Sequence, residues 1–446
     1  MSFQVAYIPI GVPTFHLESA QIQFEKSCSM MHSLSDGAVC PDKMLLSIDD
    51  LKAYLDTIHP DLIVLQNITF ANAAYASEVL KKFDCPVVLW TLREPVIDGG
   101  RLRLNSLTGA YSAANAIHAF RKGGIFEYIF GGPEEEKVIS EIGAAIRAAK
   151  VKTEMASLKM TAIGHTPQGF GFGRALDAEM MSAFGVTLES IEARELIEKA
   201  KGYTDEECAE FLDKANELMV GLCCTPEKNV KDFARLYKAY YEYVTANNIG
   251  AISSRCWPDF FTSFGTPVCG VLSMMNALGV SASCEADCYG ALSMFVGSKL
   301  TGKSTFFGDP VSMDESEGTV TLWHCGMAAC DLARKDTGAA VGVHPNRKLG
   351  PAMDFGCEAA EKATIFRIGR TPDAKFRFFI STGSVLDKPK QFQGTSIVVK
   401  TDAPAEDVVY GSVKGGWEPH FVVIYGDVAN ELEKLAHMFG VETVRI

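Results

Sequence analysis

Short apolar segments alternate with helical stretches through the first 150 residues of this 446-residue chain. Strands are predicted at residues 5–10, 62–65, 87–90 and 128–130. Strands that alternate with helices along a chain are typical of a parallel sheet with helices on its faces. The pattern restarts with an apolar segment at residues 158–163, which predicts a second domain of the same kind.

The pattern changes beyond about residue 300, where strands predominate and helices are scarce. The length of the chain also exceeds what one hydrophobic core usually covers. We predict an α/β fold in which two doubly wound, Rossmann-like α/β domains, residues 1–150 and 151–300, precede a β-rich, barrel-like domain, residues 301–446. The strands expected in that last domain are residues 319–323, 363–368, 375–380, 396–399 and 421–424, followed by a helix at 428–438.

Composition excludes several classes of partner. The chain has 42 basic and 55 acidic residues, a net charge of −13, and no run of Lys or Arg that would mark a nucleic-acid interface. It has no apolar run of about 18 residues, so no membrane span is expected. The amino terminus lacks the features of a secretion signal and the 13 cysteines are an odd number, so we expect a cytoplasmic protein with reduced thiols. An anionic small substrate stays compatible with this charge.

Acidic residues and histidines mark a candidate metal site. Glu285 and Asp287 lie in an otherwise small and apolar segment, where carboxylates are rarely buried without a partner. Asp309 follows in a Phe-Phe-Gly-Asp-Pro turn, His324 in Leu-Trp-His-Cys-Gly, and His420 in Gly-Trp-Glu-Pro-His. Two carboxylates and two imidazoles suit a hard divalent cation.

Each of these residues also has a structural explanation. Glu285 or Asp287 could cap the helix that follows, and Asp309 before Pro310 could start a turn. His324 could be a core histidine and His420 an interface residue.

Two further patterns favour structure over chemistry. The loop at residues 164–173 contains Gly169, Gly171 and Gly173 but lacks the full dinucleotide-binding pattern. An aromatic stripe at helical spacing, which includes Tyr237 and Tyr241, indicates a helix face in the core or at a subunit interface.

Several motifs together resemble the L-fucose isomerase and L-arabinose isomerase superfamily. The resemblance spans essentially the whole chain and is strongest from about residue 250 onwards. Two features depart from the fucose type: the chain is shorter, and Pro419 stands where a second histidine is expected. The motifs are Cys256-Trp257-Pro258, Cys284-Glu285-Ala286-Asp287, Gly308-Asp309, Trp323-His324-Cys325-Gly326 and Gly416-Trp417-Glu418-Pro419-His420.

The resemblance implies a metal-dependent aldose–ketose isomerase. It implies that Glu285, Asp309 and His420 bind a divalent cation, usually Mn²⁺, and that His324 corresponds to an additional histidine of the arabinose branch. Asp287 is then left as a supporting or helix-start residue. Members of the superfamily are trimers or hexamers, so a homo-oligomer is implied, in which the amino-terminal domain of one subunit closes the cleft of another.

Isomerisation of an aldose moves protons between C1 and C2 and between their oxygens, so an acid/base pair and an electrophile are needed. We expect Glu285 and Asp309 to be the catalytic pair, with enediol proton transfer favoured and a hydride shift as the rival mechanism. Arg255, Trp257 and Tyr289 are the expected substrate-binding residues. Because a guanidinium pairs well with oxyanions, Arg255 favours an anionic hexose such as sulfoquinovose.

Other functions stay open at this point. A metal-dependent sugar epimerase or aldolase would use similar residues, and a non-catalytic sugar-binding protein would need Arg255 and Trp257 without paired carboxylates near a metal.

Overall fold

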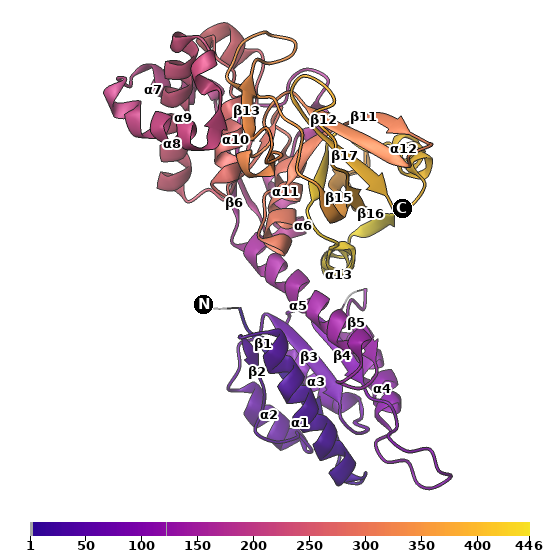
Figure 1. Cartoon of the computed structure of the whole chain (residues 1–446). Helices are drawn as coiled ribbons and strands as arrows, with labels where there is room; N and C mark the ends of the chain where they lie inside the picture. The colour runs from indigo at the N-terminus through magenta and orange to yellow at the C-terminus, as the bar shows by residue number, and fades with distance from the viewer. Residues whose placement is uncertain (1–2, 122) are drawn as a thin grey trace. The chain divides into compact units, whose positions relative to one another are not determined.

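The computed structural model describes residues 3–121 and 123–446 (Figure 1). The chain forms two compact units. Unit 1 contains the chain up to Glu154 together with Asn430–Val441, and unit 2 contains Met155–Ala429 together with Glu442–Ile446. The predicted fold class is confirmed, because two parallel α/β sheets precede an antiparallel six-stranded barrel.

Unit 1 is built on a parallel sheet with the strand order β2-β1-β3-β4-β5. Its strands are β1 (Val5–Ile10), β2 (Ala38–Val39), β3 (Leu62–Asn67), β4 (Val87–Thr91) and β5 (Glu127–Phe130). Its helices are α1 (Leu17–Leu34), α2 (Ile48–Leu55), α3 (Ala73–Lys82), α4 (Ser106–Phe120), α5 (Glu136–Ala156) and, from the end of the chain, α13 (Ala429–Phe439).

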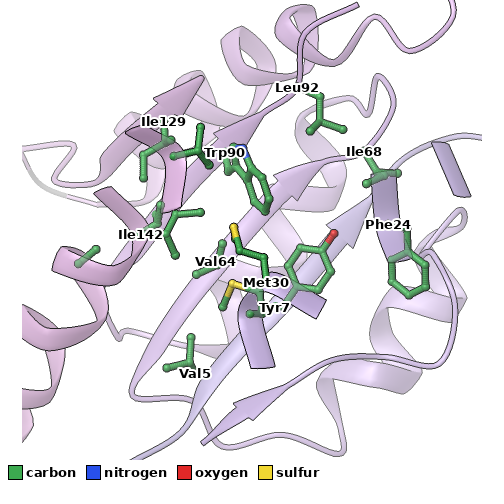
Figure 2. Packing of buried hydrophobic residues seen from close by; sticks show 14 of the residues in the cluster. Val5, Tyr7, Phe24, Met30, Val64, Ile68, Trp90, Leu92, Ile129 and Ile142 are labelled. Atoms are coloured by element: carbon green, nitrogen blue, oxygen red, sulfur yellow. The ribbon is translucent and has the colours of Figure 1, made fainter. Parts of the chain in front are cut away.

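Both faces of this sheet are buried, because alternate strand residues point to opposite sides. Val5 and Tyr7 face the cluster that includes α1 and α5, whereas Ala6 and Ile8 face the cluster that includes α2, α3 and α4. Figure 2 shows the first cluster, in which Trp90 is fully buried and donates its indole N–H to the Gly131 carbonyl at 2.9 Å. Strands that are buried on both faces account for the continuous apolar segments in the first 150 residues of the sequence.

Unit 2 begins with a second parallel sheet, of order β10-β9-β6-β7. Its strands are β6 (Lys159–Ile163), β7 (Thr187–Ile191), β9 (Ala251–Ser254) and β10 (Ser281–Cys284). Its helices are α6 (Asp177–Phe184), α7 (Ala193–Lys201), α8 (Ala209–Leu218), α9 (Glu227–Asn247), α10 (Cys269–Ala277) and α11 (Cys288–Thr301). A small sheet joins β8 (Met219–Val220), β13 (Ala339–Gly342) and β14 (Ala352–Met353).

Helix α9 carries the aromatic stripe predicted from the sequence. Tyr237 and Tyr240 are buried, and the ring of Tyr237 packs edge-on against Phe211 of α8. This part of the stripe therefore belongs to the core of unit 2.

The barrel of unit 2 closes through the pairing of β15 with β16. Asp309 lies within β11, opposite Trp323 of β12. The prediction of a turn at Phe-Phe-Gly-Asp-Pro is therefore wrong, because the backbone there stays extended and a bulge follows at Pro310. The barrel strands are β11 (Phe306–Asp314), β12 (Thr319–His324), β15 (Ala360–Arg370), β16 (Phe376–Val385), β17 (Thr395–Thr401) and β18 (Phe421–Ile424), with α12 (Ala405–Lys414) and β19 (Glu442–Arg445) beside them.

All 13 cysteines are free thiols, as expected for a chain without a disulfide framework. Within residues 3–121 and 123–446, no helix has both the length and the apolar character needed to cross a bilayer.

Candidate metal and sugar site

Glu285 lies at the carboxyl end of β10, directly after the last residue of the strand. The chain turns there in the left-handed region, with φ of 58° at Glu285 and 56° at Ala286. Such angles in residues other than glycine cost roughly 1–3 kcal/mol each and are concentrated at functional sites. Asp287 then caps α11 by accepting the Gly290 N–H at 2.9 Å, so the expectation of a helix-start residue is confirmed for Asp287.

His420 precedes β18 and brings the barrel to these carboxylates. Its Nε2 lies 2.9 Å from Glu285 Oε2 and 3.6 Å from Asp309 Oδ1. Its Nδ1 lies 2.9 Å from Asp287 Oδ2. The imidazole is fully buried, so three acidic side chains surround one ring that has almost no contact with water.

Arg367 of β15 holds Asp287 from the far side. Its Nη1 and Nη2 donate to the two carboxylate oxygens of Asp287 at 2.5 and 3.0 Å, and both side chains are essentially unexposed. A bidentate pair of this kind fixes the plane of the carboxylate. Arg367, Asp287 and His420 thus form one buried chain of charged hydrogen bonds.

His324 completes the candidate metal centre from the end of β12. Ligand atoms of Glu285, His324 and His420 all lie within 4.8 Å of one another. The carboxylate of Asp309 lies beside this trio, and its side chain is one-third exposed, against 15% for Glu285. The structure therefore brings together the four residues that the sequence predicted as metal ligands.

Burial and charge shift the pKa values of these groups in different directions. Burial opposes the charged form of His420, but Asp287 and Glu285 outweigh it and raise its pKa to about 10. Burial raises the pKa of Asp309 to about 6, although His420 acts against this shift. Burial lowers the pKa of His324 to about 4, so this imidazole is neutral near pH 7. Burial also opposes ionisation of Glu285, yet His420 holds the pKa of Glu285 below its usual value.

The donor set fits a divalent cation. Nε2 of His420 is buried and lacks a well-formed hydrogen bond although a carboxylate oxygen is close. Asp287 accepts from the opposite ring nitrogen, an arrangement that metal-bound histidines commonly have. Carboxylate oxygens with one or two imidazoles suit Mn²⁺ or Mg²⁺ better than a thiolate-preferring ion.

The glycine-containing loop before α6 packs against the site. The rings of Phe170 and Phe172 lie 6.4 and 5.7 Å from the ring of His420. A Cβ atom on Gly173 would lie 2.8 Å from Cα of Asp287, so a side chain is excluded there by close approach. Phe170 and Phe172 thus pack against the candidate metal site through their rings, and Gly173 allows the loop backbone to approach Asp287.

The three predicted substrate-binding residues have different surroundings. Trp257 is half-buried and packs edge-on against Phe170 at 6.2 Å. Arg255 pairs with Asp259 at 2.9 Å and donates to the Trp257 carbonyl at 3.1 Å, so its charge already has a partner. Tyr289 is fully buried against Phe376. Substrate contacts of these residues stay predictions.

Sequence reasoning missed Arg367, Phe170 and Phe172. A lone arginine inside the apolar strand at residues 363–369 was a usable signal, because a buried guanidinium requires a buried acid. The two phenylalanines gave no comparable signal, since their place depends on how the loop folds back.

Comparisons with known proteins agree with this geometry. No protein-family model matches the chain. The chain is 64% identical over 440 residues to a sulfoquinovose isomerase of Clostridium sp. (strain MSTE9), covering 99% of this chain and 98% of that one. It is 37% identical over 443 residues to a sulfoquinovose isomerase of Priestia aryabhattai, covering 98% of both chains.

A solved solute-binding protein of an ABC transporter from Agrobacterium vitis, bound with α-D-tagatopyranose, is 15% identical. The match covers 68% of this chain and 90% of that one, and its TM-score of 0.16 is too low to support a sugar-binding protein. The predicted isomerase class is confirmed by the full-length relatives, and the chain belongs to the sulfoquinovose isomerase family.

Proposed function

We propose that this chain interconverts sulfoquinovose and the corresponding 2-ketose by proton transfer through an enediol. The observation that carries the proposal is the convergence of Glu285, Asp309 and His420, with the Nε2 atom of His420 2.9 and 3.6 Å from the two carboxylates. The names of the full-length relatives supply the substrate. The relation to the L-fucose isomerase and L-arabinose isomerase superfamily belongs to the same proposal.

Glu285, Asp309 and His420 would hold a divalent cation, Mn²⁺ in the first instance, with His324 as a further ligand. When bound, the cation supplies an electrophile that polarises the sugar oxygens and stabilises enediolate charge. Both carboxylates are more solvent-accessible than His420, which supports an approach of the sugar from their side.

The two carboxylates suit different proton transfers. Before a cation binds, burial raises the pKa of Asp309 to about 6, which is close to neutral pH, where a carboxylate can both accept and donate a proton. Glu285 has a pKa held low by His420, so it stays ionised near neutral pH. One of the two would move the proton between C1 and C2, and the other the protons of O1 and O2.

We also propose a homo-oligomer, a trimer or a hexamer. The resemblance to the isomerase superfamily supports it, and unit 1 has an apolar surface groove of about 280 Å³ beside its edge strand β5. The side chains of Tyr111 and Tyr128, which line this groove, are 74% and 46% exposed. Light scattering coupled to gel filtration checks the assembly.

The activity test is isomerisation of sulfoquinovose by the purified chain with added Mn²⁺, followed by NMR in ²H₂O. We expect ketose to form, deuterium to enter at C2 of recovered aldose, and both to stop after chelation. Glu285→Gln and Asp309→Asn are expected to lower kcat at least about 100-fold, as loss of a positioned acid or base does.

Turnover that survives complete chelation, or a Glu285→Gln variant with normal kcat, would overturn the mechanism. Products of carbon–carbon cleavage would indicate an aldolase. A sugar with one hydroxyl-bearing carbon inverted would indicate an epimerase. Transfer without solvent deuterium would favour the hydride shift.

A further inference from the structure

We infer that Arg347 binds the sulfonate of the substrate and selects anionic over neutral hexoses. This inference rests on the proposed function. Sulfoquinovose carries its reacting carbons, C1 and C2, at one end and its sulfonate on C6, at the other. A site for it therefore needs a cationic group displaced from the metal ligands by the length of a sugar.

Arg347 is an exposed arginine whose guanidinium has no acidic partner among the described residues. Its Cζ lies 5.9 Å from the ring centre of Trp257 and 5.8 Å from that of Phe261. Stacking on aromatic faces leaves the edge donors of a guanidinium free, and these donors match an oxyanion in two-point geometry.

Trp257 connects this guanidinium to the metal ligands. Arg347 lies over the face of this indole ring. Phe170 packs on Trp257 at 6.2 Å and also on His420 at 6.4 Å. Trp257 and Phe170 thus form a row of aromatic contacts between the Arg347 guanidinium and His420.

The backbone around Arg347 is held in place by His344. Nδ1 of this histidine accepts the N–H groups of Asn346 and Arg347 at 3.2 and 3.3 Å. The ring of His344 is almost fully buried and packs edge-on against Phe261 at 5.0 Å. Arg347 is therefore presented by a fixed turn, as a binding residue must be.

Neighbouring cations fit the role less well. Arg255 already pairs with Asp259 and with a carbonyl, so binding a sulfonate would require it to leave those partners. Lys348 reaches only the side-chain oxygen of Gln393, at 3.4 Å, and adds positive charge beside Arg347. Arg347, which the sequence did not single out, therefore takes the sulfonate-binding role in place of Arg255.

The test compares Arg347→Met with the unaltered chain on two substrates, sulfoquinovose and 6-deoxyglucose, which lacks only the sulfonate. We expect the ratio of their kcat/KM values to fall about 10- to 100-fold, mainly through KM for sulfoquinovose, as loss of a charge-assisted pair predicts. Arg347→Lys should restore part of the ratio. Lys400→Met, which removes an exposed charge from β17, is the matched control and should leave the ratio unchanged.

A calorimetric titration with the open-chain alditol of sulfoquinovose, against glucitol, provides a readout without turnover. Arg347→Met should remove the preference for the sulfonated alditol. Turnover of sulfoquinovose with an unaltered ratio in this variant would overturn the inference alone. Absence of any isomerisation by the unaltered chain, with a preserved preference in the titration, would instead overturn the proposed function.

Discussion

Asp287 and His420 lie 2.9 Å apart, from Oδ2 to Nδ1, and both side chains are almost fully buried. Burial opposes ionisation of Asp287, yet Arg367 and His420 hold its pKa far below the usual value. An ionised Asp287 requires the proton of the imidazole to sit on Nδ1, which leaves Nε2 as the atom that faces Glu285 and Asp309. Asp287 thus orients the imidazole so that Nε2, the proposed ligand atom, faces the two other carboxylates.

Asp287→Asn tests this orientation. The amide accepts more weakly from Nδ1, so Mn²⁺ affinity is expected to fall about 10- to 100-fold. Arg367 would lose its buried partner, so unfolding free energy should drop by about 3–5 kcal/mol. Calorimetric Mn²⁺ titration of the folded variant measures the first effect. Asp402→Asn, an exposed change after β17, is the control, and unchanged affinity in a folded Asp287→Asn protein would contradict the role.

Metal affinity should rise with pH. The Nε2 atom of His420 must lose a proton before it can bind a cation. Before a cation binds, burial opposes the charged form of His420, but Asp287 and Glu285 outweigh burial and raise its pKa to about 10. Below that value each pH unit should strengthen Mn²⁺ binding by up to about tenfold. Asp309, with a pKa of about 6, adds a second proton only at lower pH. Dissociation constants at pH 6, 7 and 8 that do not differ would refute this coupling.

Gly173→Ala should weaken the candidate metal site, although Gly173 is not one of its proposed ligands. A methyl group there would meet the backbone of Asp287 at 2.8 Å, so Asp287 or the loop must shift. We expect weaker Mn²⁺ binding and a loss of about 1–3 kcal/mol of stability, as overpacking typically causes. Gly171→Ala is the matched control, because nothing lies within 4 Å of a Cβ at that glycine. Equal effects of the two substitutions would show that the close approach does not matter.

Trp90→Ala should destabilise unit 1 without weakening the metal site. The indole is fully buried and its N–H bonds to Gly131, so truncation should cost about 3–5 kcal/mol. Ile22→Ala, at a half-exposed position on α1, should change stability by less than about 0.5 kcal/mol. Differential scanning calorimetry gives the first effect, and Mn²⁺ titration below the transition should give an unchanged dissociation constant.

Much of this architecture could be predicted because local patterns record burial. The apolar segment at residues 5–10 became β1, and the segment at 421–424 became β18. Burying a polar group costs free energy unless it has a partner. The sequence could therefore single out the four polar residues in apolar surroundings, which are Glu285, Asp309, His324 and His420. Their convergence could not be derived from spacing, since it depends on the barrel closing between β15 and β16 and on two left-handed residues after β10.

Arg347 is a residue that the sequence could not single out. Arg255 adjoins the Cys-Trp-Pro motif in sequence, and its role in anion binding stays a prediction; the structure adds that Asp259, four residues away, pairs with it. Arg347 is 90 residues from Trp257 and gave no local signal. Only the fold reveals which of two arginines keeps its charge unpaired.

The return of α13 to unit 1 has a consequence for synthesis. Unit 1 includes Asn430–Val441, in which Leu432 and Leu435 are fully buried, while β19 afterwards pairs with β16 of the barrel. A ribosome therefore releases nearly the whole polypeptide before the first unit has all its parts. We expect a nascent chain cut before residue 430 to expose apolar surface and to depend on chaperones, although its strands β1 to β5 emerged first.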